Sequence, residues 1–136
     1  MNQKGETREV FFADPETAPE RPMARQGGRS VRLVDEGCGA RTVDLHLNIL
    51  AGGGRRADAP YHIHTNAENV YFVLQGRLGV RLEDEDRIVE AGKAVFIPPH
   101  VPHAVWNAGD EEARLIEIYS PPGADFVRLE GEERAP

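Results

Sequence analysis

Cysteine is almost absent from this sequence. Cys38 is the single cysteine among 136 residues, which excludes an internal disulfide framework and a structural zinc site built from several thiolates. Because it lies between Gly37 and Gly39, we interpret it as a turn residue. Such sparing use of cysteine fits a reducing compartment, and we expect a cytoplasmic protein.

Long apolar runs and an excess of basic residues are also missing. No segment approaches the ~18 consecutive apolar residues that cross a bilayer, and the N-terminus lacks the apolar core of a signal peptide. The 23 acidic residues outnumber the 16 Lys and Arg, which gives a net charge of −7. Nucleic acids and anionic membranes bind clustered basic residues, so we predict that neither is a partner. The length suits one compact domain.

The apolar residues that are present follow the period of β-strands, and no segment has the pattern of an amphipathic helix. Apolar residues alternate with polar ones from Val43 to Ile49, which predicts a half-buried strand with His46 on its solvent side. Residues 70–74 are apolar on both faces, as in a strand buried on two sides. Further short strands with turns every eight to twelve residues predict an all-β sandwich or barrel.

Two end segments differ from this β region. Residues 1–29 contain Pro15, Pro19 and Pro22 and lack apolar periodicity, so we predict an N-terminal arm before a barrel at residues 30–122. Within the arm, 10–12 reads Val-Phe-Phe, which suggests an edge strand packed on the barrel or on a second subunit. Residues 123–136 form a short C-terminal tail.

Four of the five histidines lie in two segments. His62 and His64 point to the same side if their segment is extended, because side chains alternate along a strand. A third histidine about forty positions later, His103, joins them if the sheet curls back on itself. A neutral imidazole offers a nitrogen lone pair at pH 7, so the three predict a metal site.

The spacing around these histidines is that of two known motifs. After His64 a glycine follows at Gly76, and in the second segment the spaced residues are Gly92, Pro98, His103 and Asn107. This pattern resembles the small single-domain proteins of the cupin superfamily. The resemblance implies a double-stranded β-helix, which is a cupin or jelly-roll barrel.

The sequence departs from the family pattern where the fourth metal ligand is expected. Counted back from Gly76, the position of the family's metal-binding glutamate is Asn69, and Glu68 precedes it. A shift of one residue sends a side chain to the opposite face of a strand, so only one of the two points inward without a bulge. Asn69 matches the count, Glu68 would need the bulge, and loss of the metal is the third alternative. His100 also replaces a glycine of the second motif.

Three histidines and one oxygen ligand suit one divalent transition metal ion: Fe, Mn, Ni, Cu or Zn. Such a set leaves coordination positions open for water or substrate. Tyr71 shares the face of Asn69, which makes it a candidate proton donor, although a core tyrosine has the same pattern. Tyr61 and Trp106 are out of phase with the histidines, so we expect them on the outer face or in a subunit contact.

The resemblance implies an enzyme acting on a small oxygenated organic molecule, of the dioxygenase, isomerase, lyase or decarboxylase type. The alternative is a non-catalytic barrel that binds or senses a small ligand. A cupin-type transcription regulator is disfavoured because no helical DNA-binding segment is present. Apolar strands, the 10–12 segment and Trp106 predict a homodimer.

Overall fold

The computed structural model describes residues 9–23 and 27–129. In this part the chain forms eleven strands and two short 3-10 helices, and none of its helices has the length and apolar character needed to cross a membrane. The strands are β1 (Glu20–Met23), β2 (Gly28–Val34), β3 (Asp44–Leu50), β4 (His62–Ile63), β5 (Glu68–Gln75), β6 (Arg77–Arg81), β7 (Asp86–Glu90), β8 (Ala94–Ile97), β9 (Ala104–Asn107), β10 (Ala113–Ser120) and β11 (Val127–Arg128). The 3-10 helices are η1 (Glu36–Cys38) and η2 (Arg56–Asp58).

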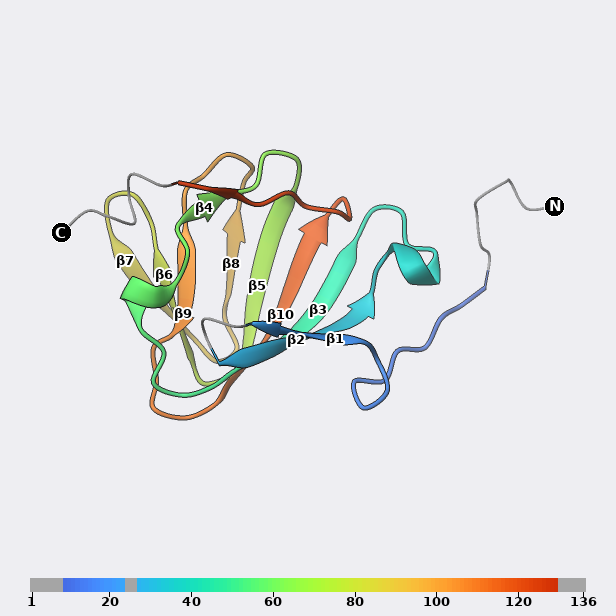
Figure 1. The fold of residues 1–136 in the computed structure, drawn as a ribbon, viewed down its shortest axis with the longest axis horizontal. Helices are drawn as coiled ribbons and strands as arrows, with labels where there is room; N and C mark the ends of the chain where they lie inside the picture. Colours follow the sequence, from blue (N-terminus) through green and yellow to red (C-terminus); the bar gives the residue numbers. More distant parts are fainter. Residues whose placement is uncertain (1–8, 24–26, 130–136) are drawn as a thin grey trace.

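The strands pair antiparallel into three sheets that close into a barrel (Figure 1). The largest sheet has the order β1-β2-β3-β10-β5-β8, the second has the order β7-β6-β9, and β11 pairs with β4. An isolated bridge between His62 and His103 connects β4 to the start of β9. The predicted all-β, double-stranded β-helix is confirmed.

The large sheet has an unusual distribution of polarity between its faces. Polar residues of β3, among them His46 and Asn48, point into the barrel and are buried, at 4% and 2% exposure. The alternate residue Leu47 faces outward and packs with Val31 of β2 and Ile116 of β10. The prediction that His46 is solvent-exposed is therefore wrong, because the apolar face of β3 is covered by its own neighbours and the polar face lines the interior.

The outer face continues onto β5 and β8, where it is open to solvent. Phe72 and Leu74 are 38% and 49% exposed, and Phe96, whose strand pairs with β5, is 54% exposed. In the single chain, β5 is thus buried on its inner face, where Tyr71 and Val73 belong to the main core. The prediction of burial on both faces is not met within one chain.

The predicted N-terminal arm contributes a strand. Residues 20–23 form β1 at the edge of the large sheet, while residues 10–12 form no strand and lie exposed. At the other end, residues 127–128 fold back to pair with β4. The outermost parts of the predicted arm and tail, 1–8 and 130–136, lie outside the described residues.

The motif glycines and asparagine hold turns. Gly76 joins β5 to β6 and Gly92 precedes β8, and both have φ near +87°, a region that other residues rarely adopt. His100 has φ of 68°, which explains why this position of the second motif favours glycine. The Asn107 amide group donates to the carbonyls of Leu50, Ala51 and Glu111 and thereby ties the β9–β10 turn to the end of β3.

Tyr61 and Trp106 pack within the chain. Tyr61 is 4% exposed, and the Arg81 guanidinium lies 4.0 Å from its ring centre. The Trp106 ring lies over Gly79, where any side chain would collide with it, and also packs on the cluster that contains Tyr61. Leu78 and Val80 of β6 belong to the main core, so Gly79, which alternates with them, lies on the outer face of the strand. Tyr61 and Trp106 therefore pack on the outer face, as expected, but Tyr61 is covered by neighbouring residues of its own chain.

Candidate metal centre

The three predicted histidines meet at one point in the barrel. The bridge between β4 and β9 places His62 beside His103, with N–H to carbonyl oxygen distances of 3.0 Å in both directions. His64 follows two residues later on the same side, and its Nε2 atom lies 3.1 Å from Nε2 of His62. One ligand atom from each of the three histidines lies within 4.8 Å of the others.

Backbone carbonyls orient each of the three rings. Nδ1 of His62 lies 2.9 Å from the Pro60 carbonyl oxygen, and Nδ1 of His103 lies 2.8 Å from that of Val101. Nδ1 of His64 forms a hydrogen bond with the Asp125 carbonyl. A carbonyl only accepts, so each Nδ1 carries the proton and each Nε2 keeps its lone pair. All three lone pairs are therefore available to one ion.

The protonation state also fits a metal. Burial, followed by the neighbouring His103, lowers the pKa of His62 to about 3. Burial likewise lowers the pKa of His103, and its Nε2 atom is buried without a hydrogen-bond partner. At pH 7 these imidazoles are neutral, and the unsatisfied Nε2 is the type of atom that a divalent ion would satisfy. The donor set fits a divalent transition metal.

Asn69 and Glu68 lie on opposite faces of β5. Asn69 is fully buried, with its amide nitrogen donating to Glu117 at 3.2 Å and to the Ile118 carbonyl at 3.0 Å. Its Oδ1 atom is buried without a partner. Glu68 is exposed at the start of the strand. Asn69, the residue that the count back from Gly76 selects, therefore points into the barrel, and Glu68 points to solvent.

Glu117 is a buried carboxylate that the sequence interpretation missed. It lies on β10, is 6% exposed and accepts hydrogen bonds from Asn48 at 2.7 Å and from Asn69. It also forms hydrogen bonds with the side chains of Tyr71 and Tyr119. The signal in the sequence is one acidic residue inside the otherwise apolar run 115–119, on the same face as Leu115 and Tyr119.

Tyr71 lies beside the histidines but is deeply buried. It lines a cavity of about 100 Å³ together with His62, Glu117 and Tyr119. Burial and the nearby Glu117 carboxylate raise the pKa of Tyr71 well above its ordinary value, and the same causes act on Tyr119. Both phenols therefore remain protonated near neutral pH and can donate hydrogen bonds.

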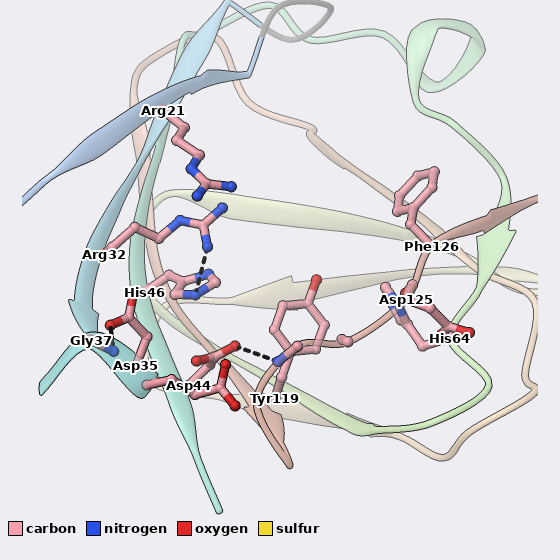
Figure 2. Close-up of a pocket in the computed structure, with 13 residues that line it drawn as sticks. Arg21, Arg32, Asp35, Gly37, Asp44, His46, His64, Tyr119, Asp125 and Phe126 are labelled. Atoms are coloured by element: carbon pink, nitrogen blue, oxygen red, sulfur yellow. Dashed lines mark hydrogen bonds between the residues drawn. The ribbon is translucent and has the colours of Figure 1, made fainter. Parts of the chain in front are cut away.

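A larger cavity of about 470 Å³ adjoins the metal centre (Figure 2). His64 lies on one side, His46 and Arg32 lie on the other, and Tyr119 lies between them. Its volume is in the range of small-molecule sites. The sequence did not predict this cavity for two reasons. One part of its wall is the polar face of β3, for which the alternating pattern predicts exposure to solvent. The other part comes from β1 and β2, which begin within the segment predicted to be an N-terminal arm.

The C-terminal segment covers the histidines from outside. Phe126 stacks on His62 with ring centres 4.0 Å apart and an angle of 14°. Asp125 accepts hydrogen bonds from the Thr65 backbone and hydroxyl groups, which fixes the carbonyl that orients His64. His100 is exposed, although its backbone N–H donates to the His64 carbonyl at 2.8 Å.

Comparison with known proteins agrees with this geometry. A family model described as a cupin domain matches residues 50–119. The chain belongs to the cupin family. It is 33% identical over 101 residues to the polyketide synthase CurC of Streptomyces cyaneus, a match that covers 74% of this chain and 64% of CurC. It is 30% identical over 116 residues to the protein SchB of Streptomyces halstedii, covering 82% of each chain.

Solved cupin structures have the same fold. The polyketide cyclase RemF from Streptomyces resistomycificus superposes with a TM-score of 0.72 at 20% identity, covering 89% of this cupin and 86% of RemF. KdgF from Halomonas sp. gives 0.69 at 17% identity, covering 85% and 96%. The predicted family is confirmed, and the three-histidine cluster occurs in a fold whose members include enzymes.

Proposed function

We propose that this cupin is a metal-dependent enzyme acting on a small oxygenated organic molecule. The observation that carries the proposal is the convergence of three histidine Nε2 atoms, each on a ring that a carbonyl orients at Nδ1, beside a cavity large enough for a substrate. A closed structural site would have no such neighbouring space.

His62, His64 and His103 would hold the ion, and we infer that Asn69, rather than Glu68, adds an oxygen ligand. The unpartnered Oδ1 of Asn69 and its burial support this choice. When bound, a divalent Fe, Mn, Ni, Cu or Zn ion would polarise a carbonyl or stabilise an enolate. With a neutral amide ligand the centre would keep more positive charge than with a carboxylate.

The protein's own acid–base groups are the two phenols around Glu117. Tyr71 keeps its predicted role as a candidate proton donor, and Tyr119 joins it because it lines both cavities. Glu117 accepts hydrogen bonds from the two phenols and from the side-chain amides of Asn48 and Asn69. These hydrogen bonds fix the orientation of both tyrosine side chains. When substrate binds, we expect the Tyr119 hydroxyl to turn from Glu117 and donate its hydrogen bond to a substrate oxygen near His64.

Elemental analysis of the purified protein tests this function. We expect about one transition metal ion per chain, and turnover that disappears on chelation and returns with the ion. Because relatives include CurC, quercetin 2,3-dioxygenase of Bacillus subtilis and an oxalate oxidase of Triticum aestivum, the first compounds to test are a linear poly-ketone, quercetin and oxalate. A metal-free protein that retains a small ligand would instead support the non-catalytic binding barrel.

We also propose a homodimer formed through the outer face of the large sheet. Phe72, Leu74 and Phe96 are exposed there on adjacent strands, and the apolar segment at residues 10–12 lies exposed as well. A second copy would bury these side chains and give β5 the two-sided burial that its sequence indicates.

Light scattering at micromolar concentration should therefore give the mass of a dimer. Phe72→Gln combined with Phe96→Gln should shift it towards the monomer, because two aromatic contacts are lost in each copy. Ile88→Gln, which changes an exposed apolar residue of the other sheet, is the matched control. A wild-type monomer would contradict the proposal.

A further inference from the structure

Two arginines on neighbouring strands face the larger cavity. Arg21 of β1 pairs with Ser30 of β2, and Arg32 lies two residues beyond Ser30, so the two are diagonal neighbours on the same face. Both side chains extend into the cavity from one wall (Figure 2). Two positive charges at this spacing repel each other unless an anion lies between or beside them.

No carboxylate neutralises these two charges in residues 9–23 and 27–129. Neither Arg21 nor Arg32 forms an ion pair there, and Arg32 contacts the neutral ring of His46 at 3.4 Å. The Nε atom of Arg32 is buried with no hydrogen-bond partner. A buried guanidinium donor without an acceptor is costly, and an oxyanion in the cavity would supply that acceptor.

Three of the four acidic residues that line the same cavity accept hydrogen bonds from backbone N–H groups, and the fourth, Glu36, is exposed. Asp44 accepts a hydrogen bond from the Gly123 N–H at 3.2 Å, Asp35 from the Gly37 N–H at 2.9 Å, and Asp125 from the Thr65 N–H at 2.7 Å. These carboxylates do not form ion pairs with Arg21 or Arg32, but their negative charges make the cavity unfavourable for a multiply charged anion. A single carboxylate suits this balance better than a phosphate dianion.

We propose that Arg21 and Arg32 form a carboxylate subsite, so that the cavity binds a small organic acid with its carboxylate on the arginines. Guanidinium groups bind carboxylates through charge-assisted, often two-point hydrogen bonds. His64 and Tyr119 line the same cavity, so the remainder of the acid would extend towards the histidines. As a statement about the substrate, this inference rests on the proposed function.

The subsite can be tested with benzoate as the probe, benzamide as its neutral counterpart and inorganic phosphate as the alternative anion, using NMR titrations of the full chain. We expect benzoate to bind at least tenfold more tightly than benzamide and more tightly than phosphate. Arg32→Gln should weaken benzoate binding about 10–100-fold, as expected for a lost charge-assisted hydrogen bond. Arg21→Gln should weaken it several-fold, since Arg21 is more exposed.

Arg29→Gln is the matched control, because Arg29 lies on β2 with its side chain on the opposite face, near Glu20. Its benzoate affinity should equal that of the wild type. If Arg32→Gln does not fold, the exposed Arg21→Gln carries the test. Equal affinities for benzoate and benzamide, or an equal loss in Arg29→Gln, would overturn the subsite, and tighter binding of phosphate would overturn the choice of a carboxylate.

The same titration in a His64→Ala variant separates this inference from the proposed function. Benzoate binding that persists there supports the arginine subsite independently of the metal centre. If the metal analysis fails while benzoate discrimination stands, the enzyme proposal is wrong and the subsite remains. If benzoate discrimination fails while metal-dependent turnover stands, the subsite alone is wrong.

Discussion

Replacement of His64 by alanine should remove the metal from this cupin while leaving a folded barrel. The variant loses one of three imidazole ligands, and loss of an outer partner alone typically costs about 10–100-fold in metal affinity. We therefore expect a loss of at least ~100-fold, together with loss of any metal-dependent turnover. Elemental analysis after dialysis measures the metal content, and circular dichroism checks the β structure.

His100→Asn is the matched histidine control. His100 is exposed, and its backbone has φ of 68°, a conformation that asparagine tolerates better than most residues. Metal content should be unchanged in this variant. Full occupancy in His64→Ala would count decisively against the three-histidine assignment.

Asn69→Asp should bind the metal at least ~10-fold more tightly than the wild type, because a carboxylate adds Coulomb attraction at contact distance. The same change should lower the stability of the metal-free protein. The Asn69 amide now donates to Glu117 at 3.2 Å, and the substitution would place a second carboxylate against that buried one. Metal titrations and thermal unfolding with and without the ion measure the two opposite effects.

Glu68→Gln provides the comparison on the exposed face of the same strand. Its metal affinity should stay within about twofold of the wild type, since a surface charge is screened by solvent. A strong loss in Glu68→Gln with silent Asn69 variants would mean that Glu68 is the ligand through a rearranged strand. Small, equal effects at both positions would indicate a three-histidine centre completed by water.

The sequence was informative where spacing along the chain decides position in space. His62 lies on the short strand β4 and His64 follows directly after its end, and the turn glycines Gly76 and Gly92 lie between the motifs. The count back from Gly76 likewise gave the inward side of β5. These local relations predict which residues share a face, and the resemblance to cupins implies the barrel that brings His103 to the other two histidines.

The sequence was uninformative where distant strands decide which face is inside. His46 alternates with leucines, and local pattern alone assigns such a residue to solvent. Only the packing of β2 and β10 on the leucine side reverses that assignment. Glu117 and Arg32 were missed for the same reason, since the cavity depends on how β1, β2 and β10 come together.

The contact between the C-terminal segment and His64 couples two equilibria: binding of the ion at the histidines, and packing of residues 123–128 against them. The Asp125 carbonyl holds the His64 ring in the orientation that exposes Nε2, and Phe126 rests on His62. If the packed C-terminal segment raises the affinity of the centre for the ion by some factor, then ion binding must raise the equilibrium constant for packing of that segment by the same factor. Occupancy of the centre and protection of residues 123–128 from proteolysis would therefore rise and fall together, and shortening the chain before Asp125 would act on the ion without touching a ligand.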